Sequence, residues 1–531
     1  MIALAALLPV LSVAIVVEDH AVLRAAPQLD APRSVALARG DWLEVRGERA
    51  GFLQVYDHRR ERPGYARTGD VRRHLLDESA APALRAVIDF VKDSPGAESL
   101  GIGYVALYLR AAPSSAPTAD VLDALGTMAE RLADRASAKS VKDTPGAPLA
   151  TQLDAAASYG VTFIHREIGG RTVTCYDGDA FRRVLAIGGS PVERQRAALA
   201  LTRPACVDEN LGPVERTAWN EWRLEVLRRA DPTGLAPWEA APLRLRAAGI
   251  LGELTWDRAR HGDTTGADKL ASEAMRELAL VDRRAIAESD VAAYDEAALR
   301  VAAVRWASEP VRSNAHARIE LALGEGTQPG ETCVELRREA RSSSTASAPT
   351  VPRGAASSSS TASAATAPRG AASSSSTASA ATVPRGAARA KVVLARRCTF
   401  ATVWPASLRV SPDGRAAALA VSPLAGWSEL WIFRAPPASD DKSIQWNVDP
   451  LLPATRDPDL GYVELAGWTP DSRSALVVRE ARRGQHGVDK QFQVLRLETL
   501  GVERHARDPE QLLAFRRWAD ASWRGSTIAL R

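Results

Sequence analysis

The chain has 531 residues, of which 46% are hydrophobic and 25% charged, an ordinary composition for a globular protein. This length exceeds what one hydrophobic core usually organises, so we expect several domains. The 68 basic and 64 acidic residues nearly balance and give a formal net charge of +4. Without a strongly one-signed field, nucleic acid is not an expected partner.

The chain begins with an apolar stretch, residues 1–17. The stretch is too short to cross a bilayer comfortably and, with small residues at Ser12 and Ala14, is typical of a signal peptide spanning residues 1–14. A buried first strand is the alternative, because no Lys or Arg precedes the stretch. We expect no other membrane-spanning segment, and we expect a periplasmic or secreted protein.

The residues 15–74 form short alternating segments separated by turns, which predicts a small β-barrel. The segments follow one another as Val22-Leu23-Arg24-x-x-Pro27, Leu37-x-x-Gly40-Asp41, Val45-x-Gly47, Phe52-x-x-Val55 and Gly64-Tyr65. In this order they resemble bacterial SH3-like domains, although Phe52 stands where that family usually has tryptophan. The resemblance implies binding of peptidoglycan peptide or of an envelope protein.

Four aromatic residues of this segment are candidate ligand-binding residues: Trp42, Phe52, Tyr56 and Tyr65. Two or three of them could line a peptide groove in the manner of SH3 domains. The alternative is that these alternating aromatic side chains fill the core of the small barrel.

From residue 80 to 310 apolar residues recur with a period near 3.6, which predicts a mainly α-helical domain. A β-hairpin interrupts the helical pattern at 161–176, and Ser190-Pro191-Val192-Glu193 predicts a capped helix start.

The cysteine set is sparse and even: Cys175, Cys206, Cys333 and Cys398. In an exported protein this predicts two disulfides, and four cysteines permit three pairings. We expect Cys175–Cys206 and Cys333–Cys398, because segments predicted as neighbouring strands carry the second pair. No Cys-x-x-Cys spacing occurs and the histidines are scattered, so neither a metal site nor a cofactor is expected.

Cys175 also has a catalytic alternative, because it precedes a predicted helix as the nucleophile of a cell-wall cysteine peptidase or amidase does. However, Asp177 and Asp179 follow it closely, and acidic neighbours raise a thiol pKa. The Asp-Cys-Ser-Gly motif of those enzymes is missing from the sequence around Cys175. A disulfide is therefore the favoured interpretation.

Residues 342–389 repeat a Ser/Ala/Thr/Pro-rich unit, with Pro352, Pro368 and Pro384 in equivalent positions. Without bulky apolar residues such a segment cannot offset its ordering entropy, which predicts disorder. The segments before and after it, 332–336 and 391–394, are both predicted strands. We therefore expect the tract to be an insertion within one hairpin.

After the tract, Ser411-Pro412-Asp413-Gly414 and Thr469-Pro470-Asp471-Ser472 mark two similar turns, each followed by a predicted strand. These repeats resemble the blades of TolB-type β-propellers. We expect residues 311–341 and 390–531 to form a propeller-like antiparallel β domain.

The sequence thus predicts a multidomain α+β protein: an SH3-like barrel, a mainly α-helical middle and a C-terminal β domain. It contains no Gly-x-Ser-x-Gly, His-Glu-x-x-His or P-loop motif. The expected function is non-enzymatic binding or scaffolding in the bacterial envelope, with the ligand unknown.

Overall fold

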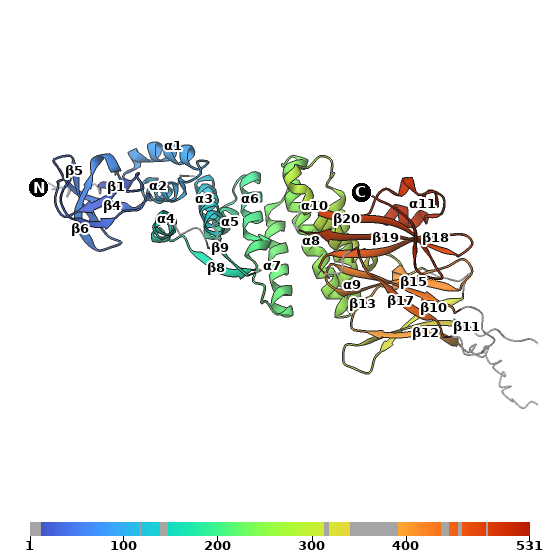
Figure 1. Ribbon diagram of the computed structural model, residues 1–531. Helices are drawn as coiled ribbons and strands as arrows, with labels where there is room; N and C mark the ends of the chain where they lie inside the picture. The colour runs from blue at the N-terminus through green and yellow to red at the C-terminus, as the bar shows by residue number, and fades with distance from the viewer. Residues whose placement is uncertain are drawn as a thin grey trace, which may run out of the picture.

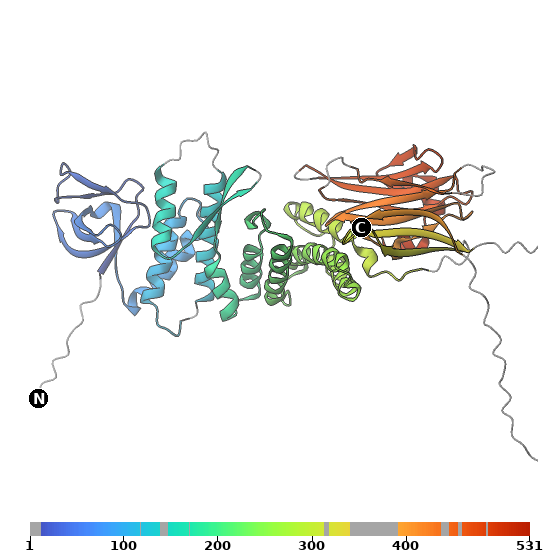
Figure 2. The same cartoon turned by 90° about the horizontal axis from the view of Figure 1, so that it is seen from below.

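The computed structural model describes residues 12–116, 118–138, 147–168, 170–312, 318–339, 391–436, 445–454, 459–484 and 487–530. The molecule is elongated, with an N-terminal sheet, a helical middle and C-terminal sheets in chain order (Figure 1). Figure 2 shows from below that the final helices of the middle, coloured light green and ending at residue 302, lie beside the C-terminal sheets. The multidomain α+β architecture is confirmed.

The N-terminal sheet is antiparallel, with the strand order β3-β2-β6-β5-β4-β1-β7. Its strands are β1 (Ser12–Val16), β2 (Val22–Arg24), β3 (Arg33–Ala36), β4 (Trp42–Arg49), β5 (Phe52–Asp57), β6 (Arg62–Arg67) and β7 (Val71–Leu75). Among the described strands β3 and β7 are edges, so the pairing does not close. The expected SH3-like barrel is therefore seen as an open antiparallel sheet, in which β1 lies between β4 and β7 and β3 does not pair with β7.

The first strand corrects the boundary expected at residue 14. β1 pairs with a strand on each side, and Val13, Ala14 and Ile15 are fully buried. Removing residues 12–14 would leave the sheet and its core incomplete. For residues 12–16 the structure shows the alternative, a buried first strand, whereas residues 1–11 of the expected signal peptide lie outside the described residues.

The middle is mainly helical, as predicted. It contains α1 (Ala81–Val91), α2 (Glu98–Ala111), α3 (Ala119–Ala138), α4 (Ala147–Ser158), α5 (Asp179–Ile187), α6 (Pro191–Leu201), α7 (Pro213–Ala230), α8 (Pro237–Arg260), α9 (Thr264–Ala279) and α10 (Val291–Ala302). The hairpin is β8 (Phe163–Ile168) and β9 (Arg171–Tyr176). Ser190 and Glu193 form the expected capping box at the start of α6.

The C-terminal region contains two sheets. One has the order β10 (Ile319–Glu325), β11 (Thr332–Glu339) and β12 (Lys391–Thr399). The other comprises β13 (Thr402–Val403), β14 (Arg409–Val410), β15 (Ala416–Leu424), β16 (Trp427–Arg434), β17 (Asn447–Leu451), β18 (Gly461–Trp468), β19 (Ser474–Arg483), β20 (Gly487–Arg496) and β21 (Val502–Ala506). Two short helices follow, α11 (Leu513–Trp518) and α12 (Ala521–Ser526).

The expected antiparallel propeller is corrected in two ways. β16 and β18 pair in parallel, through Trp427 with Gly461 and Ser428 with Tyr462, so the larger sheet is mixed. Among the described strands β13 and β21 are edges, and no ring of blades closes. The sequence contains too few blade repeats for the at least four blades of a closed ring.

The two predicted turns do have the same local hydrogen bonds. The Ser411 hydroxyl donates to Asp413 Oδ1 at 2.6 Å, and the Ala416 amide donates to the Ser411 hydroxyl at 2.9 Å. In the second turn Thr469 donates to Asp471 Oδ1 at 2.6 Å and accepts from the Ser474 amide at 3.0 Å. The sequence repeat thus corresponds to one repeated turn that leads into β15 and into β19.

Strands β11 and β12 are antiparallel neighbours, with Glu339 opposite Lys391 and Cys333 opposite Cys398. Residues 340–390 therefore connect two paired strands, as the sequence suggests. The tract expected to be disordered, 342–389, lies outside the described residues.

Two disulfides, Cys175–Cys206 and Cys333–Cys398, join the pairs expected from the sequence. Disulfides persist in oxidising compartments, so they favour a location outside the cytoplasm. Within the described ranges no helix is both long and apolar enough to cross a membrane.

Candidate functional site

The four predicted ligand-binding residues share one side of the N-terminal sheet. Leu43, Leu53, Val55 and Ala66 pack in the interior of the sheet. Because side chains alternate along a strand, their neighbours Trp42, Phe52, Tyr56 and Tyr65 point to the opposite side. We call these four residues the aromatic face. Phe52 is only 5% exposed, whereas the other three are half-buried.

The structure brings two of the four together through His58. The Trp42 ring stacks on His58 with centroids 5.4 Å apart, and the Tyr56 ring meets the same imidazole edge-on at 4.8 Å. The guanidinium of Arg110 lies 5.3 Å from the Trp42 centroid, and that of Arg46 lies 4.3 Å from the Tyr56 centroid. These guanidinium positions give cation–π contacts to both rings.

Phe52 and Tyr65 do not join this group. They lie opposite Arg67 and Gln54 in the sheet, respectively, and neither makes a ring contact with another described residue. Of the four candidate ligand-binding residues, Trp42 and Tyr56 therefore share a ring partner, and whether they line a peptide groove stays a prediction.

Glu44 supplies the negative charge of this surface. It accepts a hydrogen bond from Arg46 Nε at 3.0 Å, and its Oε2 lies 2.5 Å from His58 Nε2. The bonds to Arg46 and then to His58 lower the pKa of Glu44, so it is anionic at neutral pH. Aromatic rings framed by both signs of charge can stack on a peptide and hydrogen-bond to it.

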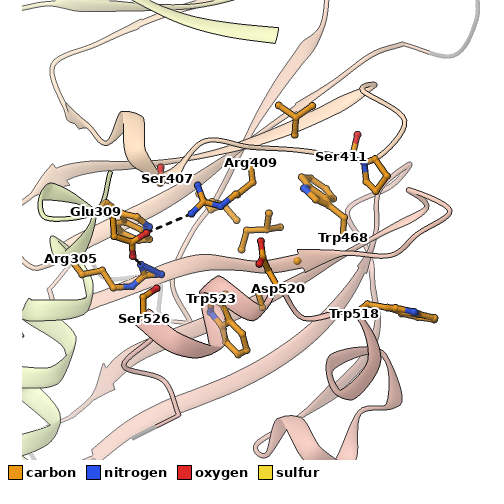
Figure 3. Close-up of a pocket in the computed structure, with 17 residues that line it drawn as sticks. Arg305, Glu309, Ser407, Arg409, Ser411, Trp468, Trp518, Asp520, Trp523 and Ser526 are labelled. Carbon is orange, nitrogen blue, oxygen red and sulfur yellow. Dashed lines mark hydrogen bonds and ion pairs between the residues drawn. The ribbon is translucent and has the colours of Figure 1, made fainter. Parts of the chain in front are cut away.

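A second candidate site is a pocket of about 550 Å³ in the C-terminal region (Figure 3). It lies between η5 (Arg305–Ala307), β14, the end of β18 and the two short helices α11 and α12. We call it the tryptophan pocket, after four of its lining residues: Trp306, Trp468, Trp518 and Trp523.

A network of buried charges forms one end of the tryptophan pocket. Arg305, 4% exposed, forms ion pairs with Glu464 and, at 2.8 Å, with Glu309. Glu464 also accepts hydrogen bonds from Trp523 Nε1 at 2.8 Å and from Thr527 Oγ1 at 2.5 Å. These bonds fix Arg305 and Trp523 in place.

Arg409 forms a side wall of the pocket. Its Nη1 donates to the carbonyls of Ala406 at 2.7 Å and Leu408 at 2.9 Å, and Nη2 lies 3.6 Å from Glu309. Burial, followed by the positive charge of Arg312, lowers the pKa of Arg409, while the carboxylates of Glu309 and Asp520 oppose this shift. The guanidinium of Arg409 is thus bonded mainly to the two carbonyls and to Glu309.

The other end of the pocket is formed where α11 meets β18. The Asp520 amide donates to the Ala466 carbonyl at 2.8 Å. A Cβ on Gly467, whose φ is +159°, would lie 2.6 Å from the Trp518 carbonyl oxygen, so this close approach requires glycine. Trp468 lies beside it, and its Nε1 is buried with no hydrogen-bond partner among the described residues.

The sequence analysis did not identify this pocket. Its residues come from positions 305–309, 407–412, 430, 465–468 and 518–526, which are brought together only by the fold. The available signal was the repeated turn, because Ser411 and Pro412 line the pocket and Trp468 directly precedes the second copy.

The catalytic alternative for Cys175 is corrected by the structure. Its sulfur is bonded to Cys206 and the residue is 3% exposed, so no thiolate is available there to act as a nucleophile. No group of three or more His, Cys, Asp or Glu residues suited to a metal ion occurs within the described ranges.

Comparison with protein-family models, with curated proteins and with solved structures finds no match for this chain.

Proposed function

We propose that this chain is a non-enzymatic exported protein of the bacterial envelope that binds a peptide ligand through its N-terminal SH3-like sheet. The observation that carries the proposal is the cluster of Trp42, His58 and Tyr56, flanked by Glu44 and Arg46. Half-buried aromatic rings with charged neighbours are typical of surfaces that anchor a partner.

Peptidoglycan peptide is the proposed ligand, and an envelope protein is the alternative. Stem peptides carry amide, carboxylate and amine groups, which Arg46, His58 and Glu44 could pair while Tyr56 packs against the peptide chain. The two disulfides support an oxidising compartment, periplasmic or extracellular. The elongated shape and the two C-terminal sheets support a scaffolding role, with further surfaces away from the aromatic face (Figure 1).

The test is retention of the purified, oxidised full chain on isolated peptidoglycan. Tyr56→Ala should weaken retention about tenfold or more, the loss typical of an aromatic anchor. Trp238→Ala is the matched control, since Trp238 is 61% exposed and lies in α8, far along the chain from the aromatic face. Equal retention of the wild type and both variants would contradict the proposal.

A further inference from the structure

Asp520 differs from the other charged residues that line the tryptophan pocket. Ion pairs join Arg305 to Glu309 and Arg409 to Glu309. Asp520 forms no ion pair with any described residue. Its charge acts on Arg409 at longer range, where it opposes the burial that lowers the pKa of that guanidinium. Asp520 is therefore the lining carboxylate whose charge has no direct partner among the described residues.

The four tryptophans of the pocket also differ in whether they have a ring or cation contact. Trp306 has the Arg305 guanidinium 4.4 Å from its ring centroid, and Trp523 packs edge-on against Phe515 at 6.1 Å. Trp468 and Trp518 have no ring or cation contact with a described residue. Figure 3 shows both of them on the Asp520 side of the pocket, away from the Arg305–Glu309 pair.

The Asp520 side chain is held in position by the chain around it. Its Oδ1 accepts hydrogen bonds at 2.9 Å from the amide and from the hydroxyl of Ser522, so it caps α12. Its Oδ2 has no bond to any described residue. In Figure 3 the carboxylate points into the space between Arg409 and Trp468.

We propose that this side of the tryptophan pocket binds a monovalent organic cation, an ammonium or guanidinium group, between Trp468, Trp518 and the Asp520 carboxylate. Tryptophan is the aromatic side chain that attracts cations most strongly, and each contact contributes about 0.5–2 kcal/mol. Arg305 on Trp306 is an example of this contact inside the same pocket.

Other ligand classes fit the pocket less well. An anion would meet the unpaired Asp520, while the Arg409 side chain is already bonded to two carbonyls and faces Glu309. An uncharged apolar ligand would remove the Asp520 carboxylate from water without pairing it, which is costly. The volume of about 550 Å³ suits a side chain or a small amine.

The cation could be carried by a lysine or arginine side chain of a peptide or by a free amine. Titration of the full chain, followed by tryptophan fluorescence and calorimetry, should show binding of acetyl-lysine methylamide. Acetyl-norleucine methylamide, which has the lysine side chain without its terminal ammonium group, should bind at least about tenfold more weakly. Tighter binding of acetyl-Ala-Ala-Lys-Ala-Ala-amide than of butylamine would identify a peptide as the source, and equal binding would identify the free amine.

Asp520→Asn keeps a good helix cap and removes only the charge, so it should weaken acetyl-lysine methylamide about tenfold. Asp508→Asn is the matched control, because Asp508 caps η7 (Pro509–Gln511) in the same way at 2.9 Å and does not line the pocket. Norleucine binding as well as lysine, unchanged affinity in Asp520→Asn, or no binding of any cation would overturn the proposal. Tyr56→Ala should leave this affinity unchanged, so the site is tested separately from the aromatic face.

Discussion

Two of the buried carboxylates, one in each half of the molecule, have very different surroundings. Glu464 in β18 is 1% exposed and meets Arg305, the Trp523 indole and the Thr527 hydroxyl. Asp123 in α3 is 5% exposed and is paired with Arg196, but its Oδ1 has no hydrogen-bond partner among the described residues. Burial raises the pKa of Asp123 to about 6, against the opposing effect of Arg196.

Glu464, with both oxygens bonded, supports the structure. Asp123, with one oxygen unbonded, is a buried group whose protonation changes the stability. Buried polar networks rigidify a structure when every member is satisfied, and a partly satisfied group is costly. Since Arg305 and Trp523 both line the tryptophan pocket, the Glu464 network prearranges that site. The Asp123–Arg196 pair supports no comparable site, and the aromatic face of the same half depends on the more exposed Glu44 pairs.

The largest effect is expected from breaking the Arg305–Glu464 pair, in which both oxygens of Glu464 are bonded although Arg305 Nε is buried without a partner among the described residues. Arg305→Met leaves Glu464 buried without its cation and should destabilise the C-terminal region by about 3–5 kcal/mol. Arg229→Met is the control, because its pair with Glu225 is exposed and should be worth about 0.5 kcal/mol or less. Hydrogen exchange in the full chain measures the loss of stability of each variant, in β18 and β19 for Arg305→Met and in α7 for Arg229→Met. Similar losses in the two variants would show that the network is not the main support.

Removing the disulfides should have a slightly smaller effect, and one that differs between the halves. The Cys333–Cys398 bond spans 65 residues and Cys175–Cys206 spans 31. Loop entropy then gives about 4.3 kcal/mol for the first bond and about 3.7 kcal/mol for the second. Urea unfolding of the two double alanine variants tests this order. A larger loss for the shorter loop would mean that chain entropy does not set the difference.

The raised pKa of Asp123 gives a pH test of the comparison. The folded state holds the extra proton between pH 3.8, the ordinary pKa, and about pH 6. The contribution of Asp123 to stability therefore falls as the pH rises through this range, by up to about 3 kcal/mol. Asp123→Asn should remove this fall in urea unfolding curves. Asp134→Asn, on the exposed part of α3, should retain it.

The sequence predicted local features of this fold well. The capping box at Ser190, the 163–176 hairpin and the turns at Ser411 and Thr469 each depend on a few adjacent residues. The pairing of Cys333 with Cys398 followed from the two strands that flank one tract. Such features depend on short-range chemistry that a single sequence contains.

Other features made by distant segments were not predicted. The signal-peptide boundary at residue 14 was misjudged because an apolar stretch such as residues 12–16 fits both a signal peptide and a buried strand. In the tryptophan pocket Arg305 and Glu464 meet across 159 positions, and no local pattern marks that contact. The same limit explains why the contacts of His58 with Trp42 and Tyr56 were not predicted.

The smallest effect is expected from deleting residues 340–390 and joining Glu339 to Lys391 through an Asn-Gly turn. Those two residues already lie opposite each other in β11 and β12, so a type I′ turn can replace the connection. The deletion alone should change the stability by less than about 1 kcal/mol, because the Cys333–Cys398 bond already holds the two strands close together in the unfolded chain.

The deletion should, however, weaken the disulfide beside it. With the loop shortened, the entropy that Cys333–Cys398 removes from the unfolded chain falls, and the contribution of the bond should drop to about 3 kcal/mol. A double-mutant cycle that combines the deletion with the Cys333→Ala and Cys398→Ala pair measures this coupling of about 1 kcal/mol. The Cys175→Ala and Cys206→Ala pair should show no coupling to the deletion, because that loop lies in the other half of the molecule. Equal coupling at both bonds would mean that the residues 340–390 stabilise the whole chain, contrary to an insertion confined to one hairpin.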